Sequence, residues 1–119
     1  MREEINSWWE QAKRDVVTAE NSFTSKDYYA SVFWCHQAVE KGLKALLIKK
    51  TGKFPKIHDL FTLAKRLDAP EDIRILCSII NPAYTDARYP DFLKTYMKKD
   101  AEDLIKKSGM VLAWIEKNL

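Results

Sequence analysis

The pattern of apolar and polar residues along the chain predicts helices rather than strands. From about Glu3 to Thr24, apolar residues recur at steps of three and four, which places them on one face of a helix with the charges opposite. No segment shows the alternation of apolar and polar positions that is typical of a half-buried strand. The apolar residues of this first helix are Ile5, Trp8, Trp9, Ala12, Val16, Ala19 and Phe23.

A second helix is predicted from Asp27, a suitable N-cap residue, to about Lys50, with Thr51 and Gly52 ending it. At about 100° per residue, its polar residues share one arc and apolar residues fill more than half of the circumference. This helix is therefore expected at the centre of a bundle. Its polar arc either meets a ligand or a partner, or forms the solvated face. The residues of the arc are His36, Gln37, Glu40, Lys41 and Lys44.

Three further helices are predicted. One begins near His58 or Asp59, one runs from Pro70 to about Ile80 before Pro82, and the last runs from about Phe92 to Lys117. Residues 83–91 are expected to form an irregular connection. The residues expected to be buried are Leu60, Phe61, Ala64, Leu67, Ile73, Leu76, Cys77, Ile80, Met97, Ala101, Leu104, Ile105, Leu112 and Ile115.

These elements predict an all-α fold, an up-and-down bundle of four to five antiparallel helices that forms a single domain over residues 1–119. Four tryptophans are more aromatic surface than a bundle of this size usually buries. A hydrophobic dimer face would account for the excess and predicts a homodimer, and aromatic packing inside the core explains it comparably well.

Composition adds few constraints on function. The net charge of +3 permits anionic partners without requiring them. Cys35 and Cys77 lie in apolar helical patterns, and with two histidines in the chain no zinc-site spacing occurs, so we predict neither a metal site nor a cofactor. The sequence shows no signal peptide and no stretch of roughly 20 apolar residues. We therefore expect a cytoplasmic protein without a membrane span.

Several motifs together resemble one known family. They are a first helix with paired tryptophans, the segment Gln37-Ala38-Val39-Glu40-Lys41-Gly42-Leu43-Lys44-Ala45-Leu46, the triplet His58-Asp59-Leu60, and the segment Tyr84-Thr85-Asp86-Ala87-Arg88-Tyr89-Pro90. The motifs cover nearly the whole sequence, and in their order and spacing the chain resembles the HEPN family of helical domains.

The resemblance implies a bundle of four or five helices, often dimeric, with a proposed nucleotide-binding role. Prokaryotic members are commonly encoded beside a minimal nucleotidyltransferase, in pairs of toxin and antitoxin type, or are fused to one. Many relatives are metal-independent RNases that use an arginine followed, after four to six residues, by a histidine.

This sequence departs from the RNase motif. No arginine lies within seven residues before His36 or His58, and no histidine follows Arg88. Lys53 precedes His58 at a suitable spacing, but a lysine lacks the planar fork with which arginine grips phosphate. We therefore assign no catalytic residue, and the sequence argues against RNA cleavage by the family's route.

Arg88 is the first candidate for ligand binding. It lies in the connection between two helices, flanked by Tyr84 and Tyr89, where a guanidinium can bind phosphate while an aromatic ring stacks on a base. The alternative is that Arg88 pairs with Asp86, Asp91 or a carboxylate of the second helix and fixes the loop.

The other candidates have structural alternatives of their own. His58 can bind an anion at a helix start or cap that helix, with capping favoured, and His36 is expected to be a partly buried imidazole bonded within the bundle. Glu40 and Lys44 have the spacing of a helix-stabilising ion pair. Alternatively, Lys41 and Lys44 lend positive charge to a groove that also receives Arg88.

The leading hypothesis is a protein that binds a nucleotide, RNA or another phosphate-bearing ligand, or that partners a nucleotidyltransferase. A second hypothesis is a structural protein–protein interaction module without a ligand. The third is an RNase with an unorthodox site around Arg88, Tyr89 and His58.

Overall fold

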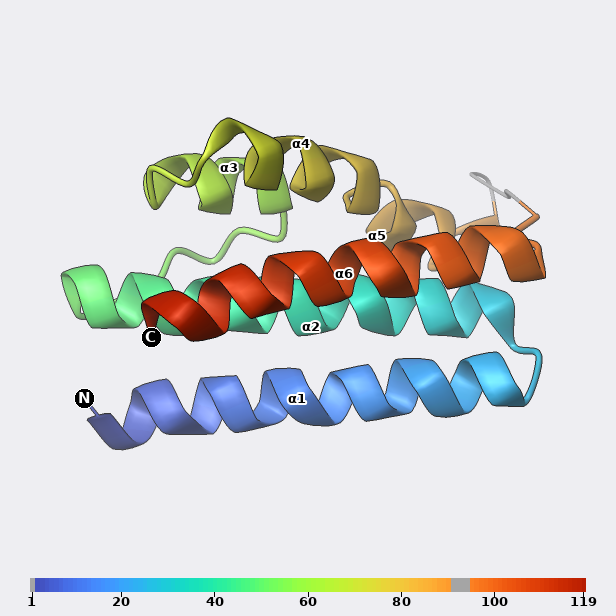
Figure 1. Ribbon diagram of the computed structural model, residues 1–119, viewed down its shortest axis with the longest axis horizontal. Coiled ribbons are helices and arrows are strands. Elements are labelled where there is room, and N and C mark those ends of the chain that lie inside the picture. Colours follow the sequence, from blue (N-terminus) through green and yellow to red (C-terminus); the bar gives the residue numbers. More distant parts are fainter. Residues whose placement is uncertain (1, 91–94) are drawn as a thin grey trace.

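The computed structural model describes residues 2–90 and 95–119, which contain helices and no strands. The predicted all-α bundle is confirmed (Figure 1). None of the helices in these ranges is long and apolar enough to cross a membrane. The helices are α1 (Arg2–Thr24), α2 (Tyr28–Thr51), α3 (Leu60–Arg66), α4 (Glu71–Ile80), α5 (Ala83–Asp86) and α6 (Lys98–Asn118).

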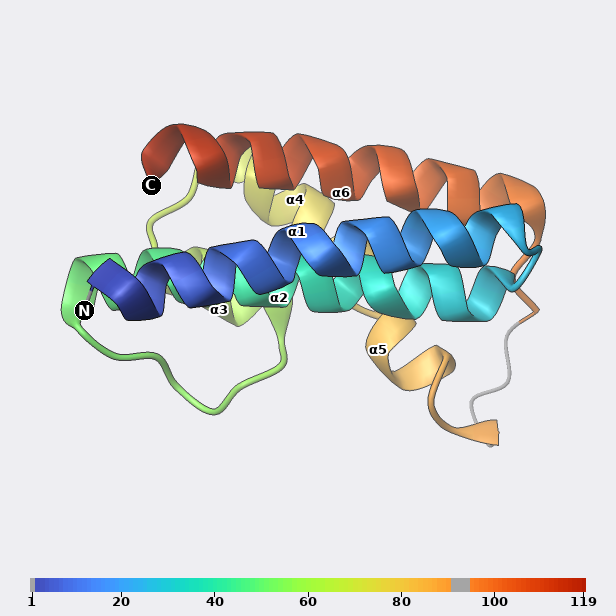
Figure 2. The same ribbon diagram turned by 90° about the horizontal axis from the view of Figure 1, so that it is seen from below.

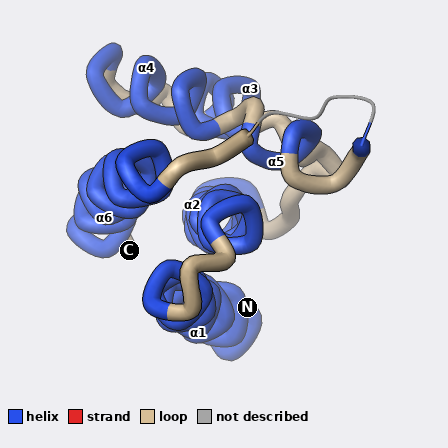
Figure 3. Tube along the Cα trace, turned by 90° about the vertical axis from the view of Figure 1, so that its right-hand side faces the viewer, coloured by secondary structure: helices blue, strands red, loops and turns tan. Residues whose placement is uncertain are grey.

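The helix α2 lies at the centre of the bundle, as its wide apolar arc predicts (Figure 3). Helix α1 runs antiparallel to α2, whereas α6 runs alongside α2 in the same direction (Figures 1 and 2). This parallel pair arises because α4 carries the chain back along the bundle before α6 begins. The shorter helices α3 and α4 form a second layer beside α2 and α6.

A close approach between α2 and α6 is made at Gly42. A Cβ atom added there would lie 2.9 Å from Cδ1 of Ile115 and 3.3 Å from Cδ2 of Leu112, both of which are buried. The missing side chain of Gly42 therefore lets α6 pack against α2 at this point. Helix α2 ends as predicted, because Gly52 adopts a left-handed conformation (φ 84°) and donates its amide to the carbonyl of Ile48.

The start of the last helix was predicted too early. Helix α6 begins at Lys98, and Met97, expected in the core, is 66% exposed. Tyr96 is buried in its place and donates its hydroxyl to Asp86 at 2.9 Å. The predicted start at Phe92 lies outside the described residues.

Two other predictions of local structure were wrong. Residues 83–86, expected to be irregular, form the short helix α5. Phe61, expected in the core, is 38% exposed, because Leu60, Leu63 and Ala64 occupy the buried face of α3 at helical spacing.

Matched substitutions at two glycines test the packing of α2 on α6. Gly42→Leu should lower the free energy of unfolding by about 1–2 kcal/mol, because overpacking costs roughly 1–3 kcal/mol, whereas the better helix propensity of leucine recovers less than about 1 kcal/mol. The control Gly109→Leu, at an exposed position of α6 with open space around it, should raise stability slightly. Urea unfolding measures both, and equal effects at the two sites would contradict this packing.

Candidate functional site

The polar arc of α2 is divided between two sides of the helix. Lys41 places Nζ 2.7 Å from Oδ2 of Asp15, a buried residue of α1 that also accepts a hydrogen bond from Gln11 at 3.1 Å. Lys41 thus belongs to the interface between α1 and α2. The structure does not bring this candidate together with Arg88.

Glu40 and Lys44 are buried, each with 4% of its surface exposed. Their side chains form an ion pair with 2.8 Å between Nζ of Lys44 and Oε2 of Glu40. The Lys44 ammonium also lies 5.4 Å from the ring centroid of Phe54 and 5.9 Å from that of Trp8. The pair is therefore covered by aromatic rings and is not part of a solvated helix face.

The two histidines lie on either side of Glu40. Nδ1 of His58 is 3.1 Å from both carboxylate oxygens of Glu40, while the His58 side chain remains 55% exposed. Nδ1 of His36 lies 3.8 Å from Oε1 of Glu40 and 3.2 Å from Oε1 of Gln37. His36 has no exposed surface, so it is fully rather than partly buried, and its Nδ1 contacts Gln37 within the bundle.

His58 does not cap α3, so the favoured structural role for this residue was wrong. The side chain of Asn81 accepts the hydrogen bond from the first amide of α3, at Leu60, over 2.9 Å. Asn81 also donates to the carboxylate of Asp59, which accepts a second bond from Thr62. Burial opposes ionisation of Asp59, but these hydrogen bonds outweigh it and lower the pKa of its carboxyl group. Sequence reasoning missed the role of Asn81, whose local signal is an asparagine between the end of α4 and Pro82.

Tyr84 of α5 joins the loop that carries Arg88 to the polar side of α2. Its ring stacks on His58 with centroids 4.8 Å apart and an interplanar angle of 15°, and it lies 5.0 Å from the ring of His36. Cζ of Arg88 is 4.3 Å from the Tyr84 centroid and 5.0 Å from that of Tyr89. The loop therefore folds back over α2 beside the two histidines. Lys41 and Lys44, which the predicted groove needed, form other contacts.

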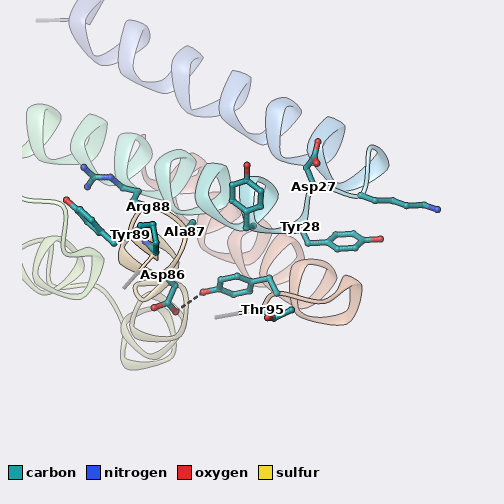
Figure 4. Close-up of a pocket in the computed structure, with 11 residues that line it drawn as sticks. Asp27, Tyr28, Asp86, Ala87, Arg88, Tyr89 and Thr95 are labelled. Atoms are coloured by element: carbon teal, nitrogen blue, oxygen red, sulfur yellow. Dashed lines mark hydrogen bonds between the residues drawn. The ribbon is translucent and has the colours of Figure 1, made fainter. Parts of the chain in front are cut away.

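The guanidinium of Arg88 is held by rings. Among residues 2–90 and 95–119, no carboxylate forms an ion pair with Arg88. Asp86 instead accepts the hydrogen bond from Tyr96, and Asp91 lies outside the described residues. Figure 4 shows the side chains of Arg88 and Tyr89 side by side, directed away from Tyr28.

Two hollows border this region. The smaller, about 340 Å³, shares His58 and Tyr84 with the ring stack and is also lined by Asp59, Ser78, Asn81, Pro82 and Thr85. The larger, about 440 Å³, lies between the start of α2 and the segment that follows α5 (Figure 4). The smaller hollow combines an exposed imidazole with amide and hydroxyl groups, which suits a polar ligand.

The described residues hold no cluster of histidine, cysteine and carboxylate side chains that fits a metal ion. Burial raises the pKa of Cys35 to about 11 and that of Cys77 to about 12. Both thiols are therefore protonated at neutral pH and behave as small core side chains.

The burial of His36 predicts a loss of stability in acid. Burial lowers the pKa of His36 below its ordinary 6.5, although the charge of Glu40, the side chain of Gln37 and the backbone of His58 oppose the shift. Below about pH 6.5 the unfolded chain then binds more protons than the folded one. The contribution of His36 to the free energy of unfolding is therefore fully present above that pH and declines as the pH falls. Urea unfolding should show a smaller decline between pH 7 and pH 5 in His36→Gln than in the wild type. Equal declines would contradict this role for His36.

Comparisons with known proteins agree with this fold. The family model described as HEPN domain matches residues 5–118. The chain is similar to TT1696 from Thermus thermophilus, whose crystal structure superposes with a TM-score of 0.90 at 27% identity over 98% of both chains. It is also similar to ST0689, an archaeal HEPN homologue, with a TM-score of 0.82 at 26% identity over 96% of both chains. No curated protein matches. Because the family model covers nearly the whole chain, the protein belongs to the HEPN domain family.

Proposed function

We propose that this protein binds a nucleotide or another phosphate-bearing ligand at the ring stack formed by Arg88, Tyr84 and His58. The observation that carries the proposal is the exposed guanidinium of Arg88, which lies over the Tyr84 ring without a carboxylate partner among the described residues. A guanidinium in this state has its hydrogen-bond donors available for phosphate oxygens.

The neighbouring residues supply the remaining chemistry. The carboxylate of Glu40 accepts the Nδ1 proton of His58, which leaves Nε2 of the exposed imidazole available to a ligand. The ring of Tyr89 is 45% exposed beside Arg88, and aromatic rings at such positions are the groups on which bases stack. Phosphate recognition and base stacking are thus supported at adjacent positions.

Membership of the HEPN family supports a proposal about partners. We propose a homodimer in the cytoplasm that acts with a minimal nucleotidyltransferase in a pair of toxin and antitoxin type. Four half-buried tryptophans are compatible with a dimer face, although Trp8 already packs against Phe54 with ring centroids 4.6 Å apart. Co-purification with an adjacently encoded nucleotidyltransferase is the direct check.

RNA cleavage is a second candidate function, favoured by the contact between Glu40 and His58. A carboxylate that holds one nitrogen of an exposed imidazole is an arrangement suited to a general base. Cleavage of RNA by the purified protein, lost in His58→Ala, would support this function. Intact RNA after prolonged incubation would exclude it.

Ligand binding is tested by isothermal titration with ATP, GTP and a short RNA. Arg88→Ala should weaken binding about tenfold or more, because it removes a charged hydrogen-bonding group worth roughly 1.5–3 kcal/mol. The matched control is Arg14→Ala on the exposed side of α1, which should leave affinity unchanged. Absence of binding at millimolar ligand, or equal affinity in Arg88→Ala and the wild type, would contradict the proposal.

A further inference from the structure

The positive charge of the chain is concentrated in one short segment. Residues 49–66 contain six lysine or arginine residues and one acidic residue, Asp59, which gives the segment a net charge of +5. The whole chain carries +3, so the remaining 101 residues carry −2. The mild overall charge therefore conceals a strongly basic region.

The fold gathers these charges at one end of the bundle. They lie in the last turn of α2, in the following loop and in the last turn of α3 (Figure 1). Nζ of Lys50 donates to the backbone carbonyl of Arg66 over 3.4 Å, which ties the ends of the two helices together. All six side chains are exposed. This basic end consists of Lys49, Lys50, Lys53, Lys56, Lys65 and Arg66.

Most of this charge is not neutralised within the chain. Lys50 pairs with Asp68 at 3.2 Å, and the Asp68 side chain is 88% exposed. Lys49 donates to the carbonyl of Asn118. In the described ranges, no carboxylate pairs with the other four cations of the basic end. Unpaired like charges that lie close together weaken folding through mutual repulsion, so the pattern points to an external anion.

An apolar hollow of about 460 Å³ opens among these cations. Leu47, Phe54 and Pro55 supply its apolar walls, and Lys53 and Arg66 lie at its border with Thr51. The Phe54 ring is already engaged edge-on by Trp8 and lies 5.4 Å from the Lys44 ammonium. The hollow thus accepts an apolar side chain more readily than a base that needs a free aromatic face.

We propose that the basic end docks an acidic segment of a partner protein, with one apolar side chain of that segment seated in the hollow. An apolar anchor ringed by complementary charges is the usual arrangement of a protein interface, and the charges speed the encounter. This surface uses none of the residues of the ring stack around Arg88, so it goes beyond the proposed ligand function.

Fluorescence anisotropy tests the docking surface with the full chain. The probe is a labelled 15-residue peptide rich in Asp and Glu with one central Leu, and a second peptide carries Ser in place of Leu. The wild type should bind the Leu peptide more tightly than the Ser peptide, and more tightly at 50 than at 200 mM NaCl. Lys53→Glu combined with Arg66→Glu should weaken binding about tenfold or more.

The matched control reverses the same amount of charge elsewhere. Lys98→Glu combined with Lys99→Glu, at exposed positions of α6, should change affinity less than about twofold. Arg88→Ala should leave peptide binding intact, which separates this surface from the ligand site. Three results would overturn the proposal. They are no peptide binding at millimolar concentration, equal losses of peptide affinity in both double variants, and tighter binding of a 15-nucleotide oligouridine than of the Leu peptide.

Discussion

The buried carboxylate of Glu40 is the constraint on which the candidate site depends. A charge removed from water in the middle of a helix is retained only where other groups compensate it, and here two side chains do so. Lys44 forms the ion pair and His58 contacts both oxygens, while the buried His36 lies 3.8 Å away in the preceding turn. Lys44 comes from α2 itself and His58 comes from the loop before α3, so Glu40 holds that loop against the central helix.

The position of Arg88 follows from this arrangement. Because Glu40 fixes the ring of His58, the nearly parallel ring of Tyr84 packs on a defined surface, and Tyr84 in turn carries Arg88 above it. A buried charge on α2 thus orients an exposed cation in the segment that follows α5, nearly fifty residues later in the sequence. The buried carboxylate thus supports the two stacked rings, and the rings support the exposed guanidinium. This arrangement is the physical argument for ligand binding at this place.

Capping residues and apolar spacing are short-range signals, and they were sufficient to predict most of the helices. The predicted ends of α1, α2 and α4 lie close to the observed ones, and α2 lies at the centre as predicted. They could not show that Glu40 and Lys44 are buried, because the covering rings of Trp8 and Phe54 come from distant segments. The same limit applies to Lys41, whose partner Asp15 lies on another helix. The resemblance to the HEPN family supplied the order of the motifs, and the structure supplied the contacts between them.

A double-mutant cycle on Glu40→Gln and Lys44→Met, followed by urea unfolding, tests most directly whether the two side chains form a buried pair that stabilises the fold beneath the site. Breaking a buried pair by removing one partner typically costs about 3–5 kcal/mol, so the two single variants should each be strongly destabilised and the double variant much less than their sum. The exposed pair Asp103 and Lys107, at 2.6 Å and the same spacing, provides the control and should show a coupling of about 0.5 kcal/mol or less. A coupling between Glu40 and Lys44 several times that of the control is the predicted result, and equal couplings would contradict it.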